Sequence, residues 1–144
     1  MKRFRFRLEQ VLRVRRLQED LARAALMHAH LEAQTAATAV NARIADYANA
    51  ARPSGAQTYE SFKRMQFELD NAAGAIKVAR ATYRDAMTVV DQQRAEWAAA
   101  RQRVAALERL EERKREEHAV EVRRAEDRLV DDLVVARHAR GVHA

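Results

Sequence analysis

A heptad repeat in the second half of the sequence constrains the fold more than any other feature. Two series of residues each recur every seven positions, and the second series lies three residues after the first. The side chains of the first series are mostly large, and those of the second are mostly small. The first series is Phe62, Leu69, Ile76, Tyr83, Val90, Trp97 and Val104, and the second is Met65, Ala72, Ala79, Ala86, Gln93, Ala100 and Leu107. This pattern predicts a long helix that packs against another helix along a coiled-coil seam. Gln93 either fixes the register of the seam or lies at a loosely packed layer.

The break at residues 52–58, RPSGAQT, divides the chain into two helical arms. We expect a first helix over about residues 4–51, a turn over 52–58 and a longer second helix over about 59–139. Since short connections favour antiparallel neighbours, the predicted fold is all-α, a single coiled-coil hairpin over residues 1–144. A turn centred on Gly55 would place Leu8 near Arg101. Residues beyond about 105 would then have no partner helix from the same chain and would form an overhang of roughly 50 Å.

Two apolar stripes are visible in the first arm. The stripes are Leu8, Val11, Val14, Leu17 and Leu21, and then Ala33, Ala37, Val40, Ile44 and Tyr47. Their change of phase predicts a stutter between them. The first six residues of the segment RFRFRLEQ alternate like a strand, but no second strand is available for pairing, so we expect a helix that starts its stripe at Phe4.

Two further apolar surfaces are expected outside the seam. The C-terminal end of the second helix carries an apolar face at Val122, Ala125, Leu129, Leu133 and Ala136, widened by Val130 and Val134. It either folds back on the N-terminal residues, pairs with a second copy or docks another protein. The second surface is an outward-facing stripe formed by Phe67, Asn71, Gly74 and Val78, interpreted as a weak candidate for partner binding.

The charge of the chain is concentrated at its start. The net charge is +6, and the first sixteen residues carry seven Lys or Arg against Glu9 alone. This local charge indicates a local contact more than a surface for nucleic acid, for which neither a recognised motif nor an aromatic platform is present. No segment approaches the roughly 20 apolar residues of a membrane span, and no apolar run follows the basic start as in a secretory signal.

Catalytic and metal-binding chemistry is not expected. The chain has no cysteine, which fits a reducing compartment, and it lacks phosphate-binding and hydrolase motifs. His28 and His30 point about 200° apart on a helix and cannot share a metal ion, while His118, His138 and His143 stand alone. We therefore predict a protein that is not an enzyme and has no catalytic residue, cofactor or metal.

The order and spacing of motifs at the two ends resemble the FliJ family of flagellar export proteins. The N-terminal motif is carried by Phe4, Leu8, Glu9, Val11, Leu12 and Arg15, and the C-terminal ones by Leu107, Glu108, Leu110 and Glu112 and by Glu126, Leu129, Asp131 and Asp132. The resemblance extends over nearly the whole chain. The Ala-rich residues 22–42 depart from the pattern.

The resemblance implies a stalk-like coiled coil that takes part in flagellum biogenesis and motility. The family is understood to insert the end bearing both termini into the hexameric ring of the export ATPase FliI, to promote its assembly and activity, and to couple it to the export gate protein FlhA, with possible escort of export chaperones. It implies a cytoplasmic protein, peripherally associated with the membrane-embedded export apparatus at the flagellar base, without membrane insertion or nucleic acid. The predicted ATPase-binding residues are Phe4, Arg7, Leu8, Val11, Arg15, Val122, Leu129 and Leu133, and the predicted gate-binding residues are Phe67, Asn71 and Val78.

Three alternatives remain open from the sequence. A YscO-like stalk of a virulence-type secretion system would share the architecture. A structural coiled-coil protein could dimerise through residues 122–136. Binding to nucleic acid through the N-terminal arginines would predict an affinity that falls steeply with salt.

Overall fold

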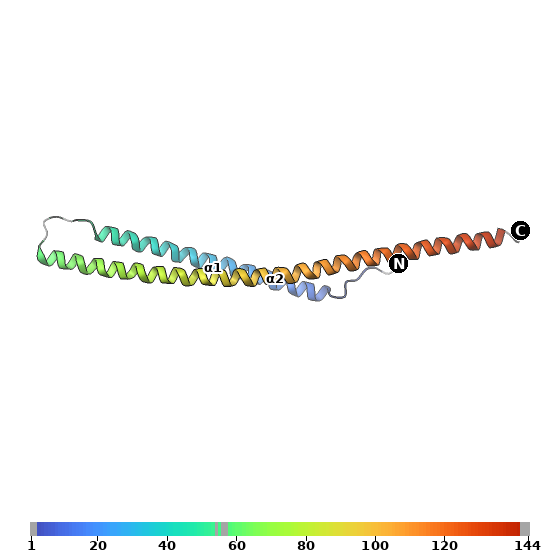
Figure 1. Ribbon diagram of the computed structural model, residues 1–144, viewed down its shortest axis with the longest axis horizontal. Helices are drawn as coiled ribbons and strands as arrows, with labels where there is room; N and C mark the ends of the chain where they lie inside the picture. Colours follow the sequence, from blue (N-terminus) through green and yellow to red (C-terminus); the bar gives the residue numbers. More distant parts are fainter. Residues whose placement is uncertain (1–2, 54, 56–57, 142–144) are drawn as a thin grey trace. The chain divides into compact units, whose positions relative to one another are not determined.

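The protein is described by a computed structural model that covers residues 3–53, 55 and 58–141. These residues form two helices, α1 (Glu9–Ala50) and α2 (Tyr59–Gly141), and none of them belongs to a strand. The helices contribute to two packed units, one made of residues 1–18 and 100–144 and the other of residues 19–99. The all-α prediction and the longer second helix are confirmed, although α1 begins at Glu9 and not at Phe4 (Figure 1).

The connection between the helices owes its boundaries to local hydrogen bonds. Thr58 caps α2, because its hydroxyl oxygen accepts a hydrogen bond of 3.2 Å from the backbone N–H of Ser61. In the connection, Gly55 adopts a φ of 63°, a left-handed conformation that a residue without Cβ enters at low cost. Within the predicted turn at 52–58, residues 54, 56 and 57 lie outside the described residues.

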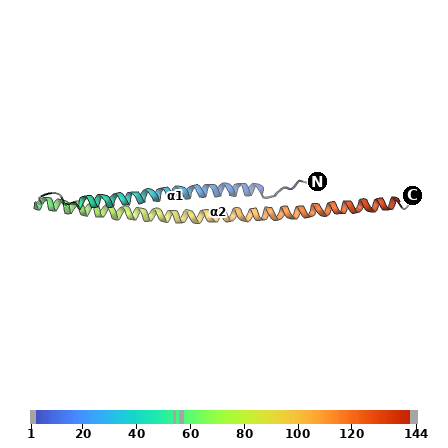
Figure 2. The same ribbon diagram turned by 90° about the horizontal axis from the view of Figure 1, so that it is seen from above.

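The unit of residues 19–99 is an antiparallel helical hairpin. Residues of α1 run alongside α2 in both views (Figure 1 and Figure 2). Val90 is fully buried and packs in one cluster with Leu26, Ala29 and Ala33, supported by Ala86, Met87 and Trp97. Because the α1 side of this cluster is largely alanine, the larger side chains of α2 can fill the space between the helices.

The heptad seam predicted for α2 is confirmed by the burial of its positions. Every a and d residue from Met65 to Leu107 is buried or half-buried, including Gln93. The exception is Phe62, which is 46% exposed. This residue lies in the first turn of α2, which has no part of α1 opposite it.

The register of the hairpin differs from the symmetric prediction. A turn centred on Gly55 would set Val90 opposite Glu19, but Val90 packs with Leu26 and Ala29. The two helices are therefore offset by about two turns from the symmetric arrangement. The offset leaves the start of α2 without α1 beside it, which agrees with the exposure of Phe62.

The seam of α1 also differs from the prediction. Within residues 19–40, the covered positions include one continuous heptad series: Glu19, Ala22, Leu26, Ala29, Ala33, Ala36 and Val40. Leu12 is buried in the same phase, so the predicted stutter is wrong. The predicted first stripe is wrong from its second residue on, since Val11, Val14, Leu17 and Leu21 are exposed. Of the second stripe, Ala33, Ala37 and Val40 are covered, whereas Ile44 and Tyr47 are not.

Candidate partner-binding surfaces

The N-terminal residues 3–8 form an extended segment that packs on α2 within the unit of residues 1–18 and 100–144. Phe6 is buried in one cluster with Leu12 and Val104. Phe4 and Leu8 pack against the edge of this cluster together with Leu107 and Leu110. We call residues 3–8 the N-terminal strap.

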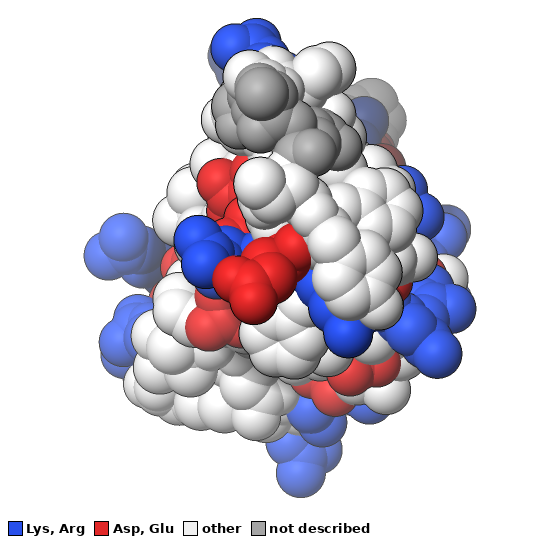
Figure 3. Space-filling model, turned by 90° about the vertical axis from the view of Figure 1, so that its left-hand side faces the viewer, with Lys and Arg blue, Asp and Glu red and all other residues white. Residues whose placement is uncertain are grey.

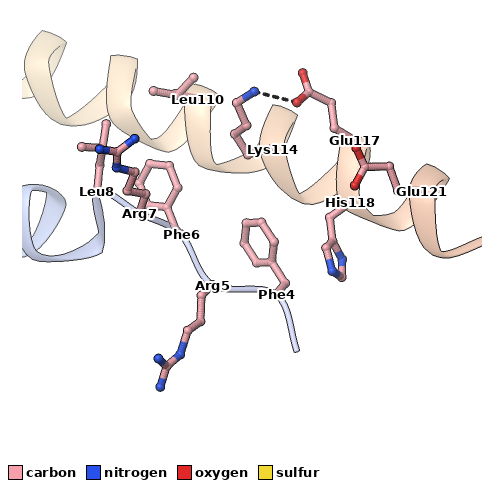
Figure 4. A pocket seen from close by; sticks show the side chains of 10 residues that line it. All are labelled: Phe4, Arg5, Phe6, Arg7, Leu8, Leu110, Lys114, Glu117, His118 and Glu121. Carbon is pink, nitrogen blue, oxygen red and sulfur yellow. Dashed lines mark hydrogen bonds and ion pairs between the residues drawn. The ribbon is translucent and has the colours of Figure 1, made fainter. Parts of the chain in front are cut away.

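The strap explains the alternating pattern RFRFRL, which was interpreted above as the start of a helix. The helix prediction is wrong here, because the alternation directs the apolar residues of an extended segment toward α2. In Figure 4, Phe4 and Phe6 lie toward α2, and Arg5 points away from it. An extended segment can therefore satisfy a period-two pattern on a helix surface, without a second strand.

Phe4 is held by two further contacts from α2. Its ring lies 5.6 Å from the ring of His118, measured between centroids. The guanidinium of Arg115 lies 5.6 Å from the centroid of the Phe4 ring, within the range of a cation–π interaction. Beside these contacts is a groove of about 630 Å³, lined by Phe4, Arg5, Phe6, Arg7, Leu8, Leu110, Lys114, Glu117, His118 and Glu121 (Figure 4). The strap thus covers α2 as far as about Glu121, so the predicted overhang from residue 105 is too long.

The basic residues of the N-terminal region differ in their partners. Arg16 forms an ion pair of 3.1 Å with Glu108 of α2, and Arg13 lies 3.9 Å from Glu9 in its own helix. The guanidinium of Arg15 donates a hydrogen bond of 3.0 Å to Gln18. Within the described part of the chain, Arg3, Arg5 and Arg7 form no ion pair. These three charges are therefore available to an acidic partner.

The C-terminal end of α2 carries an exposed apolar surface. Residues 123–141 are all exposed. Leu129 and Leu133 are each 62% exposed, and Val130, Val134 and Val135 are similarly exposed. About 20 residues of helix, roughly 30 Å, thus extend beyond the strap. Such an apolar surface on a charged helix is typical of a site of protein–protein contact.

The predicted ATPase-binding residues are only partly brought together. Phe4, Arg7 and Leu8 line the same groove. Val11 is exposed on α1 and Arg15 is half-buried. Val122 is half-buried one residue beyond the groove, and Leu129 and Leu133 follow along the exposed end of α2.

Phe67, Asn71 and Val78 share one exposed face of α2 in the other unit. Phe67 is 66% and Val78 is 67% exposed, and Gly74 between them has open space around its Cα. Their spacing of four, three and four residues keeps them on one side of the helix. The structure therefore groups the predicted gate-binding residues in one unpartnered stripe.

One surface was missed because it was assigned to the core. Val11, Val14 and Leu17 lie on the outer side of α1, away from the face that carries Leu12. The signal that could have revealed this is the competing spacing of Leu12, Leu26, Ala29 and Ala33. That series keeps the heptad phase throughout, whereas the larger side chains do not.

At the end where α1 and α2 are joined, the charged residues do not form a surface of one sign. Viewed from the end at which α1 and α2 are joined, blue and red side chains are interspersed among uncharged ones (Figure 3). Pairs such as Lys114 with Glu117 and Arg115 with Glu111 neutralise each other along α2. Neither this end nor these pairs shows the basic patch or stripe that marks a nucleic-acid-binding surface.

The described residues offer no arrangement for metal chemistry. Among them, no three His, Asp or Glu side chains are grouped closely enough to hold a metal ion. His28 lies 3.8 Å from Glu32, whereas His143 lies outside the described residues. No described helix has the length and apolar character needed to cross a membrane.

Comparison with known proteins identifies one family. The family model described as "Flagellar FliJ protein" matches residues 4–142. This match includes residues 4–8 of the N-terminal strap and the exposed end of α2. No curated protein and no solved structure is significantly similar to the chain.

Proposed function

Because the chain belongs to the FliJ family and is thus a component of the flagellar export apparatus, we propose that it acts there as a stalk that binds the hexameric export ATPase. The proposed binding region is the unit that carries the N-terminal strap and the end of α2. Binding would promote assembly of the ring and ATP hydrolysis. In this role the chain is an activator without catalytic chemistry of its own.

The observation that carries the proposal is the exposed apolar face at the end of α2. Leu129 and Leu133 project from the end of α2, residues 123–141, which no other described segment covers. Burying them in a partner would recover the stabilisation that the free helix lacks, about 1.5–3 kcal/mol for each fully buried side chain before the costs of association.

The basic residues of the strap and of the start of α1 supply orientation. Arg7 and Arg15 lie near the apolar residues Phe4, Leu8 and Val11 of the same unit. Charges at the rim of an apolar contact accelerate encounter and select the orientation of the partners. The acidic residues that would meet these arginines belong to the ATPase ring.

The stripe of Phe67, Asn71 and Val78 is proposed to contact the FlhA-like export gate. It lies in the other unit, so ATPase and gate contacts would use separate surfaces. Export chaperones are further proposed partners. The proposed location is the cytoplasmic face of the flagellar base, in peripheral association with the membrane-embedded apparatus.

The decisive experiment measures ATP hydrolysis and ring formation by the export ATPase of the same organism, with and without the full-length chain. We expect stimulation by the wild-type chain and its loss with the double variant Leu129→Ser/Leu133→Ser. Val135→Ser is the matched control, because Val135 is exposed in the same turns but on another face. A wild-type chain that neither binds nor stimulates the ATPase would reject the proposal. A virulence-type system is distinguished by repeating the assay with the ATPase of that system.

A further inference from the structure

We propose that the outer face of the first turns of α1 is a docking site for the exposed end of α2 from a second copy of this chain. The two surfaces form an antiparallel dimer with two equivalent contacts. The inference goes beyond the proposed function and does not depend on it. Because the dimer would cover Leu129 and Leu133, the dimer and the ATPase-bound chain would use this surface in turn.

The α1 surface is apolar with basic edges. Val14 is 53% and Leu17 is 60% exposed, and Val11 lies beside them. At about 100° of rotation per residue, Arg13 flanks this patch on the Leu17 side and Arg15 flanks it on the Val11 side. Arg13 has only a 3.9 Å pair with Glu9, and the partner of Arg15 is the uncharged Gln18. Both guanidinium groups thus remain available to carboxylates.

The α2 surface has the complementary pattern of an apolar centre with acidic edges. Leu129, Val130, Leu133 and Val134 form its centre, and all four are exposed. The same rotation places Asp127 at one edge, beside Val134, and Asp132 at the other edge, beside Leu129. Glu126 and Arg137 lie on the mid-line of this face, one turn before and one turn after the apolar centre. Within the described residues, neither aspartate forms an ion pair. The acidic edges of the α2 surface therefore match the basic edges of the α1 surface.

The two surfaces cannot meet within one chain. Leu12 packs in one cluster with Val104, and α2 continues as one helix from there to the apolar centre near Asp131. That separation is 27 residues, about 40 Å. A helix cannot fold back over this length without a break, and α2 has no proline and its last glycine only at Gly141.

A two-fold axis joins the surfaces of two chains at both ends. In this dimer the α2 helices of the two chains run antiparallel. The α1 patch and the α2 end of each chain are about 40 Å apart, so each α2 end lies against the α1 patch of the other chain. The start of each α1 then lies between its own α2 and the α2 of the partner. Such an interface is closed, because the same two surfaces of each copy are used and none is left free.

Analytical ultracentrifugation of the full-length chain tests the proposal through charge reversal. We expect a monomer–dimer equilibrium that weakens as salt screens the edge charges. The acidic-edge variant Asp127→Arg/Asp132→Arg and the basic-edge variant Arg13→Glu/Arg15→Glu should each raise the dimer Kd by about tenfold or more, since each creates like-charge contacts at both ends. An equimolar mixture of the two variants should regain the wild-type affinity, because both contacts of the mixed dimer again join opposite charges.

Cysteine pairing gives an independent measurement, since the chain has no native cysteine. Mixed Val14→Cys and Val130→Cys chains should form an intermolecular disulfide under mild oxidation, whereas each variant alone should not. Val14→Cys mixed with Val135→Cys is the matched control and should cross-link less. A chain that stays monomeric at high concentration and low salt would overturn the proposal. So would a dimer that is insensitive to both charge reversals, or a mixture that fails to restore it.

Discussion

The two units bury their apolar residues by different means. The unit of residues 19–99 pairs two helices over a continuous seam, with Val90 fully buried against Leu26 and alanines. The unit of residues 1–18 and 100–144 instead packs a short extended strap and the start of α1 on a long helix, and leaves residues 123–141 uncovered. The comparison shows that the first unit buries an apolar seam between its own two helices, whereas the second leaves the apolar end of α2 exposed.

The largest expected effect breaks the seam of the hairpin unit. Val90→Asp places a carboxylate at a fully buried position, and an unpaired buried charge is strongly unfavourable. We expect the free energy of unfolding to fall by more than about 3 kcal/mol. Chemical denaturation followed by the fluorescence of Trp97, the only tryptophan, measures it. The adjacent Val89→Asp is the control, because Val89 is 40% exposed, and an equal loss there would contradict the assignment of the seam.

Overfilling the alanine side of the seam should have the next largest effect. Ala33 is 4% exposed in the cluster around Val90. Ala33→Leu forces the helices apart and should destabilise the hairpin by about 1–3 kcal/mol. The matched Ala39→Leu lies at an exposed position and should change stability by less than about 0.5 kcal/mol. Thermal denaturation followed by circular dichroism distinguishes the two, and a neutral Ala33→Leu would show that the helices are not closely packed.

The strap should open at a smaller cost than the hairpin. Phe6→Ala removes its one buried side chain from the cluster with Leu12 and Val104. We expect trypsin to cleave after Arg5 or Arg7 about tenfold faster in this variant. This rate change corresponds to a decrease of roughly 1.4 kcal/mol in the free energy of detaching the strap from α2. Phe67→Ala is the control, since Phe67 is exposed in the other unit. An unchanged cleavage rate for Phe6→Ala would mean that the strap is held by other contacts.

The two helices also differ in how well the sequence predicts them. In α2 the large side chains from Leu69 to Val104 form one heptad series, so size and phase indicate the same face. In α1 the large residues Val14, Leu17 and Leu21 lie on the outer face, whereas the seam is carried mostly by alanine. A prediction that weights side-chain volume therefore selects the wrong face of α1. The close approach of the helices explains the inversion, because bulky residues of α2 leave room only for small ones opposite.

The candidate binding sites also differ in how well the sequence predicts them. For the end of α2, the sequence left folding back, pairing with a second copy and docking another protein open, and the structure shows residues 123–141 exposed. The stripe at Phe67 was predicted correctly as outward-facing, since its positions lie off the heptad seam. The strap was not, because its alternation RFRFRL has no strand partner in the sequence and its real partner is a helix surface. The register was missed because the bounds of the connection, residues 51–58, do not fix how far α2 extends past the end of α1.

The smallest expected effect concerns the ion pair that links α1 to α2 in the unit with the strap. Arg16 and Glu108 lie 3.1 Å apart, but their side chains are 54% and 50% exposed. Solvent screens such a pair, so a double-mutant cycle with Arg16→Ala and Glu108→Ala should give a coupling energy of about 0.2–1 kcal/mol. The coupling should decrease as salt is raised, since the charges face water. The cycle for Arg23 and Asp20 is the control, because that pair lies within α1 and joins no two segments. Changing both Arg16 and Glu108 should leave strap cleavage by trypsin nearly unchanged, because Phe6, and not the ion pair, anchors the strap to α2.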